Sequence, residues 1–274
     1  MSNCDSCASK GTCSGSCNKI EKEQLNELAS VKKVIGVMSG KGGVGKSSVT
    51  SMLAVALSRM GYKTGILDAD ILGPSIPKMF GLKPGVQGTE TSIFPKETHN
   101  GIQVMSVNLL LENPEDPVVW RGSIVSGTVK QFWTDVVWND LDFLFIDMPP
   151  GTGDVPLTVF QSIPVDGVVI VTSPQELVKD IVGKSYNMTK MMDIPVIGLA
   201  ENYSYIKCPD CDKEIYIFGQ GKTEEAAKEY GVPLLAKIPM DKNVAQLADA
   251  GDMDKVDVSY VQSLAMQIEG LLKQ

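Results

Sequence analysis

The chain has 274 residues, of which 43% are hydrophobic, and this is enough apolar material for one large domain or two small ones; we expect one. Its formal net charge of -8 argues against a general nucleic-acid-binding surface. No apolar run is long enough to span a bilayer, and the first residues, MSNCDSCASKG, lack the apolar core of a secretory signal. We therefore expect a cytoplasmic protein with reduced thiols, whose six cysteines are metal ligands or redox groups before disulfides.

Residues 1–19 form a polar, cysteine-rich tail that cannot build a core alone and should be disordered without a metal. Its spacing, C-x₂-C-x₅-C-x₃-C, places four thiolates close enough to enclose a metal, namely Cys4, Cys7, Cys13 and Cys17. The uneven spacing lacks the paired knuckles of a common zinc module, which favours an iron-sulfur cluster. The alternative is an unstructured tail with adventitious metal affinity. Residues 20–30 follow as a linker or short helix.

Short β-branched runs then alternate with helical patterns, which predicts an α/β fold with a doubly wound, mostly parallel sheet and helices on both faces. The runs are apolar at nearly every position, as in strands covered on both sides. We expect strands at 33–38 and within 63–70, 102–110, 141–149, 166–173, 194–202 and 232–239. Two segments interrupt this rhythm and are candidate insertions, 72–100 and 203–219, within a domain of residues 31–274.

The stretch MSGKGGVGKSSVT, residues 38–50, lies between the first predicted strand and a helix expected at about 46–59. It matches G-x-x-x-x-G-K-[ST], in which backbone amides wrap a phosphate, the lysine neutralises its charge and the hydroxyl binds Mg²⁺. A glycine turn that merely joins strand and helix does not explain Lys46 followed by Ser47. We predict a nucleotide site made of Gly40, Lys41, Gly42, Gly43, Val44, Gly45, Lys46, Ser47 and Ser48.

Acidic residues follow two of the predicted strands. Asp147 ends the run LDFLFID, where a carboxylate would lie at the edge of the sheet near Mg²⁺, and the segment MPPGTGD after it could change shape when the γ-phosphate leaves. Asp68 and Asp70 in DADILGPS could assist the metal and orient the attacking water. The alternative for these aspartates is simple capping of strands or helices.

A second cysteine motif, CPDC, supplies the thiolates of Cys208 and Cys211. Zinc and the common iron-sulfur clusters usually need four protein ligands, so this pair is half a site. A two-fold dimer would supply the identical second pair. The alternative is a zinc knuckle completed by the tail or by a partner.

Together, GKGGVGKS, DADILGPS, DMPPGTGD and CPDC resemble the Mrp/ApbC group of P-loop ATPases, carriers of iron-sulfur clusters within the MinD, ParA and nitrogenase iron protein superfamily. The resemblance covers roughly residues 30–274 and implies a homodimer in which Lys41, the second lysine of this deviant Walker A loop, reaches the partner's ATP. It also implies roles for Asp70 in hydrolysis and Asn202 at the adenine, and a [4Fe-4S] cluster bridging Cys208 and Cys211 of two subunits.

Some members carry an N-terminal [4Fe-4S] motif, C-x₁₃-C-x₂-C-x₅-C. Cys4, Cys7 and Cys13 match its last three cysteines, whereas the first has no counterpart, and Cys17 is a candidate replacement.

Our interpretation is an ATPase that carries a [4Fe-4S] cluster across a homodimer and transfers it to apo-proteins. The alternative is a ParA- or MinD-like positioning ATPase with structural zinc, and a nitrogenase-like reductase is a second one. A positioning ATPase usually needs a membrane helix or a basic DNA surface, yet the C-terminal VQSLAMQIEGLLKQ has one lysine and no basic face. We therefore expect no nucleic acid and no membrane as partners.

Overall fold

The computed structural model describes residues 21–113, 120, 122–174 and 178–273. Its centre is an eight-stranded sheet in the order β10-β7-β6-β1-β5-β2-β4-β3, parallel except for the antiparallel pair β3–β4 at one edge. Its strands are β1 (Val31–Met38), β2 (Thr64–Asp68), β3 (Lys96–Glu97), β4 (Gln103–Met105), β5 (Leu141–Asp147), β6 (Gly167–Thr172), β7 (Val196–Glu201) and β10 (Leu234–Lys237). The predicted doubly wound α/β fold is confirmed.

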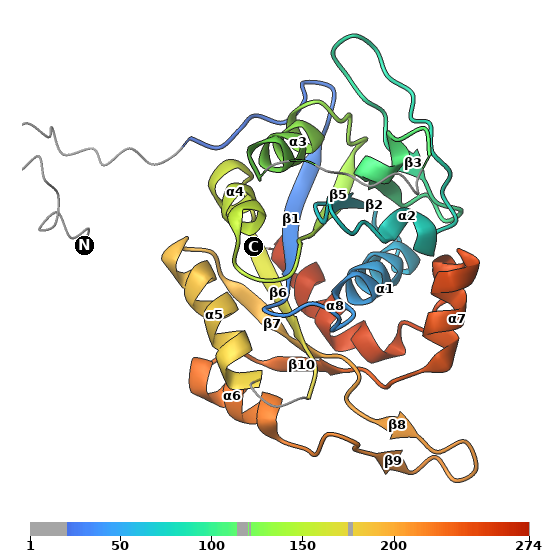
Figure 1. Ribbon diagram of the computed structural model, residues 1–274, viewed down its shortest axis with the longest axis vertical. Helices are drawn as coiled ribbons and strands as arrows, with labels where there is room; N and C mark the ends of the chain where they lie inside the picture. The colour runs from blue at the N-terminus through green and yellow to red at the C-terminus, as the bar shows by residue number, and fades with distance from the viewer. Residues whose placement is uncertain (1–20, 114–119, 121, 175–177, 274) are drawn as a thin grey trace, which may run out of the picture.

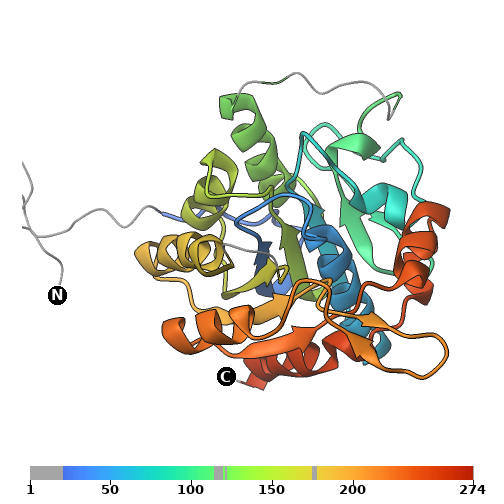
Figure 2. The same cartoon turned by 60° about the horizontal axis from the view of Figure 1, so that its bottom comes forward.

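Helices cover both faces of the sheet (Figure 1). They are α1 (Lys46–Arg59), α2 (Ile76–Met79), α3 (Gly122–Thr134), α4 (Asp154–Ser162), α5 (Val178–Met191), α6 (Lys222–Tyr230), α7 (Lys242–Ala250) and α8 (Gln262–Glu269). Short 3₁₀ turns occur at Val107–Leu109, Met253–Lys255, Ser259–Val261 and Gly270–Lys273. A separate hairpin, β8 (Ile206–Lys207) and β9 (Glu214–Ile215), protrudes from the periphery in both views (Figures 1 and 2).

The sheet separates two apolar clusters, because successive side chains of each strand point to opposite faces. In β1, Val34 and Met38 pack with residues of α3, α4, α5 and α6. Ile35 and Val37 pack on the other side with residues of α1, α2 and α8. Burial on both faces explains why the strand segments carry apolar residues at almost every position.

The observed elements differ from the expected runs at several ends. β1 begins at Val31, two residues before the predicted start, whereas the run 102–110 forms only the short strand β4 and then a 3₁₀ turn. Residues 21–30 contain no helix. They run along α3 and α4, where Glu23 N donates to Ser162 O at 2.8 Å and Trp133 Nε1 donates to Glu23 O at 3.0 Å.

Among the described residues, no helix combines the length and apolar character needed to cross a bilayer.

Phe145→Ala should destabilise the fold strongly, because Phe145 on central β5 is 0% exposed and its loss leaves a cavity under α1. Such truncations cost about 3–5 kcal/mol. Phe94→Ala is the matched control, since Phe94 is 41% exposed and should cost far less. Urea unfolding of both variants checks this, and equal losses of unfolding free energy would contradict it.

Candidate functional site

The loop between β1 and α1 is tightly folded at the carboxyl edge of the sheet, where open α/β folds bind ligands. Two of its glycines have no room for a side chain. A Cβ at Gly40 would lie 2.5 Å from Ile181 O, and one at Gly45, where φ is +76°, would lie 2.1 Å from Asn202 Nδ2. Glycine at these positions lets the loop close against its neighbours while its amides remain available to an anion.

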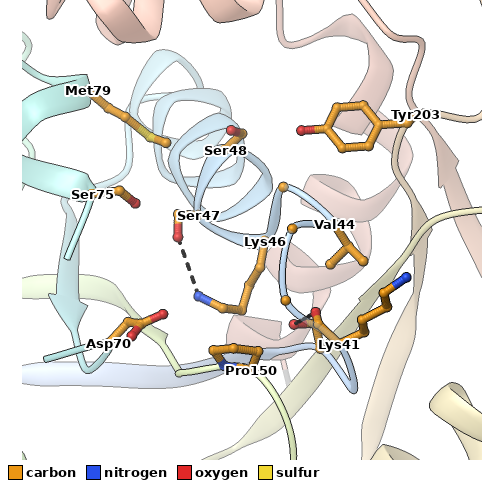
Figure 3. Close-up of a pocket in the computed structure, with 14 residues that line it drawn as sticks. Lys41, Val44, Lys46, Ser47, Ser48, Asp70, Ser75, Met79, Pro150 and Tyr203 are labelled. Atoms are coloured by element: carbon orange, nitrogen blue, oxygen red, sulfur yellow. Dashed lines mark hydrogen bonds between the residues drawn. The ribbon is translucent and has the colours of Figure 1, made fainter. Parts of the chain in front are cut away.

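The loop lines a cavity of about 270 Å³. The predicted site residues that line this cavity are Lys41, Gly42, Gly43, Val44, Gly45, Lys46, Ser47, Ser48 and Asp70 (Figure 3). Gly40 packs behind the loop against Ile181. The structure therefore brings most of the predicted site to one place.

The side chain of Asp147, at the end of β5, contacts residues at the start of α1. Its Oδ2 pairs with Lys46 Nζ at 2.8 Å and accepts a hydrogen bond from Ser47 Oγ at 2.6 Å. Its Oδ1 accepts from Thr50 Oγ1 at 2.7 Å. Lys46 Nζ also lies 3.4 Å from Ser47 Oγ (Figure 3). Every oxygen of the buried carboxylate is thus satisfied, as a buried charge requires.

Thr50 was not recognised in the sequence. It lies one helical turn after Ser47, so both hydroxyls share the face of α1 that meets Asp147. A hydroxyl three residues beyond the motif was the available signal.

Asp68 lies beside Asp147, because β2 and β5 pair in that register. Its Oδ2 accepts from Ser106 Oγ at 3.0 Å, and its Oδ1 accepts from Asp70 N at 3.2 Å. Complete burial, reinforced by the charge of Asp147 and opposed by Lys46, raises the pKa of Asp68 to about 8. Partial burial also raises the pKa of Asp70, which faces the cavity directly. Asp68 is therefore a supporting carboxyl beneath the cavity, and Asp70 is part of its wall.

Asn202 follows β7 and contacts the loop from the opposite side. Its Nδ2 donates to Val44 O at 2.9 Å, and the side chain is buried. With Tyr203 it lines a second cavity of about 380 Å³, and Ser48 and Tyr203 border both cavities. The two cavities are neighbours around the end of the loop. Tyr203 is a site residue that the sequence did not single out.

Lys41 lies on the rim of the loop. Its carbonyl oxygen accepts from Ser39 Oγ at 3.0 Å. In Figure 3 its amino group extends away from Lys46 and Ser47. The two lysines of the motif therefore face different regions.

Cys208 and Cys211 lie on the turn between β8 and β9. This hairpin protrudes beyond the loop that joins β1 to α1 (Figures 1 and 2). Cys208 N donates to Lys213 O at 2.9 Å, and Asp212, with φ +58°, donates its N–H to Cys208 O at 3.0 Å. Hydrogen bonds from the backbone N–H groups of Asp210 and Cys211, and then the Cys211 side chain, lower the pKa of the Cys208 thiol. The turn thus favours the thiolate of Cys208, the form that binds a thiophilic metal, and places Cys211 beside it.

Within the described ranges, no three His, Cys, Asp or Glu side chains converge to hold a metal ion. Cys208 and Cys211 are a two-ligand set there. The tail cysteines, Cys4, Cys7, Cys13 and Cys17, lie outside the described residues.

The glycine loop between a parallel strand and a helix, with Lys46 and Ser47 at the carboxylate of a neighbouring strand, defines a P-loop NTPase. The chain belongs to the ParA family, described as "NUBPL iron-transfer P-loop NTPase". The match to this family covers residues 30–271.

Two relatives are each called "Iron-sulfur cluster carrier protein". The one from Methanocaldococcus jannaschii is 48% identical and covers 90% of this chain and 87% of its own length. The one from Clostridium perfringens is 42% identical, with 93% and 94% covered.

Solved structures agree with the fold. A nucleotide-binding protein from Archaeoglobus fulgidus, in complex with ADP, is 42% identical with a TM-score of 0.74, covering 83% of this chain and 89% of that one. The cell-division ATPase MinD of Pyrococcus furiosus is 22% identical with a TM-score of 0.59, covering 87% and 99%, and shares the fold.

Asp68→Asn should change how the stability of the nucleotide-free protein depends on pH. The folded-state pKa of Asp68, about 8, exceeds the unfolded value, so between about pH 4 and 8 the folded chain keeps a proton that the unfolded chain loses. The unfolding free energy contributed by this group therefore falls as pH rises. Asn cannot ionise, so the variant should gain stability relative to the wild type at about pH 8 compared with about pH 5.

Denaturant unfolding at both pH values tests this. Asp249→Asn, which makes the same substitution at an exposed carboxylate, is the control. A stability difference between Asp68→Asn and the wild type that is the same at both pH values would contradict the raised pKa.

Proposed function

We propose that this protein is an ATP-hydrolysing homodimer that binds a [4Fe-4S] cluster between two subunits and transfers it to apo-proteins of the cytoplasm. The observation that carries the proposal is a turn that holds the half-buried Cys208 and the exposed Cys211, with backbone amides bonded to the Cys208 sulfur, in a chain that also holds a complete P-loop. The relatives named as cluster carriers support the same role.

The loop cavity suits the phosphates of ATP, and the neighbouring cavity suits its base, with Asn202 in its wall. Ser47 and Asp147 offer the oxygen ligands that Mg²⁺ prefers, with Asp68 behind them. Bound Mg²⁺ would neutralise charge on the phosphates. Lys46 would exchange Asp147 for a phosphate oxygen, and Asp70, on the cavity wall, would orient the attacking water.

Lys41 is proposed to act across the dimer. Its amino group extends away from Lys46 in its own subunit (Figure 3), as expected of a cation meant for a partner's nucleotide. A cation delivered in trans makes hydrolysis depend on dimer closure, as an arginine finger does.

The cluster is cargo held by Cys208 and Cys211 of each subunit, so that two half-sites supply four thiolates. Hydrogen bonds that lower the pKa of the Cys208 thiol favour the thiolate that such binding needs. We propose a second cluster at Cys4, Cys7 and Cys13 of the tail, with Cys17 as the fourth ligand.

A zinc-dependent positioning ATPase is the second candidate, because a Cys-x-x-Cys turn with amides directed at sulfur also suits zinc. Zinc bound tightly to anaerobically purified dimer, without iron or sulfide, would favour it.

The double variant Cys208→Ala/Cys211→Ala tests the carrier. Loss of one thiolate pair per subunit should remove a whole intersubunit site and about four irons per dimer, while ATP binding persists. Iron and sulfide analysis, Mössbauer spectroscopy and transfer to an apo-ferredoxin after anaerobic reconstitution measure this. Deletion of residues 1–18 is the control, and it should remove tail iron but leave a transferable cluster. Full iron content and wild-type transfer in the double variant would reject the bridging site.

Mixed dimers test the role of Lys41. Lys41→Ala should lower hydrolysis while nucleotide binding largely survives, whereas Lys46→Ala should weaken nucleotide binding and abolish turnover. A Lys46→Ala subunit still carries Lys41, so mixing the two inactive variants should restore part of the ATPase rate in heterodimers. Phosphate release measured against each variant alone decides it. Failure to complement, with heterodimers demonstrated by tagged copurification, would count against action in trans.

A further inference from the structure

A buried carboxylate closes the base of the cysteine hairpin. Glu201, the last residue of β7, is 5% exposed. Its Oε1 accepts from Ser204 Oγ at 2.5 Å, and its Oε2 accepts from Thr223 Oγ1. Ser204 precedes β8, and Thr223 lies in the first turn of α6, after β9. One side chain therefore ties together the two ends of the segment that carries Cys208 and Cys211.

This clamp, defined as Glu201, Ser204 and Thr223, is rigid by its chemistry. Both hydroxyl groups are buried, at 1% and 0% exposure. Hydrogen bonds to a carboxylate are stronger than those between neutral groups, and a buried carboxylate that loses them is costly. Because Glu201 bonds to both Ser204 and Thr223, a shift of Ser204 is opposed by the start of α6. A shift that does occur moves the start of α6 as well.

The next residues along the chain touch the nucleotide loop. Asn202 Nδ2 donates to Val44 O at 2.9 Å, and a Cβ at Gly45 would lie 2.9 Å from Tyr203 Oη. Tyr203 holds φ at +58°, a conformation that a bulky residue adopts only when its surroundings enforce it. Since Tyr203 borders both cavities, a ligand that fills them must contact this segment.

We infer that Glu201 is a positioning residue that couples occupancy of the nucleotide site to the state of the Cys208–Cys211 turn, through the continuous segment from Asn202 to Ser204. The inference rests on the proposed function for its purpose, since a carrier needs ATP to act on its cargo site. The coupling itself does not depend on which cargo is bound. Nucleotide immobilises Tyr203, and the hydrogen bonds of the clamp then restrain both ends of the hairpin.

The test uses the reduced, metal-free full chain and a timed pulse of iodoacetamide, with mass spectrometry of the peptide that contains Cys208 and Cys211. Mg-ADP should slow alkylation of this peptide about fivefold in the wild type, at the low end of typical coupling between sites. In Glu201→Ala the nucleotide should no longer change the rate, while the affinity for Mg-ADP from calorimetry stays within about threefold of the wild type.

Three further variants separate coupling from general damage. Glu214→Gln changes an exposed carboxylate of the same hairpin and should keep the wild-type response. Thr223→Ser keeps the hydroxyl and should keep the response, whereas Thr223→Val should lose it. This pair decides the matter if Glu201→Ala fails to fold.

Wild-type protection by Mg-ADP in both Glu201→Ala and Thr223→Val would overturn the inference, and so would wild-type thiols that ignore Mg-ADP despite its measured binding. Because no cluster is present, such a failure leaves the iron content and transfer of the carrier untouched. Conversely, a chain that binds zinc instead of iron would still show the coupling.

Discussion

The pairing of Asp147 with Lys46, at 2.8 Å and with both side chains almost fully buried, is the interaction on which the site depends. Removal of one partner from such a pair leaves an uncompensated charge and costs about 3–5 kcal/mol. Phosphate alone would bind Lys46 and leave the Asp147 carboxylate without its cationic partner. Mg²⁺ alone would bind Asp147 and leave Lys46 without its anionic partner. In the proposed function, Mg²⁺ and nucleotide together would replace both partners at once. The buried pair would then favour binding of the metal–nucleotide complex over either component.

The fold and the loop could be predicted because their signals are local. Fully apolar runs and the spacing of Gly40, Gly45 and Lys46 identify the strands and the phosphate loop without knowledge of any distant contact. The partners of Asp147 and Asp68 could not be predicted in the same way. Ser106 reaches Asp68 only because β4 pairs with β2, and that register is a property of the assembled sheet.

The same distinction explains the less predictable segments. In the segment 21–30, the backbone of Glu23 bonds to Ser162 and Trp133, more than a hundred positions away, so local composition did not decide between linker and helix. The spacing of Cys208 and Cys211 alone predicts a metal half-site. The amides that approach Cys208, and the left-handed backbone of Asp212 that allows the turn, appear only in three dimensions.

The distance between the two sites follows from their opposite chemical needs. In the proposed ATPase, phosphoryl transfer depends on charges that work best away from bulk water, and the buried pair of Lys46 and Asp147 would supply them. Ligand exchange at sulfur needs access, and Cys211 is exposed. A single pocket would compromise one need or the other, so the fold places the sites on different elements. Communication between two separate sites requires a stiff connection. The segment from Asn202, whose side-chain amide contacts Val44, to Ser204, which bonds to the buried Glu201, is short and has few degrees of freedom.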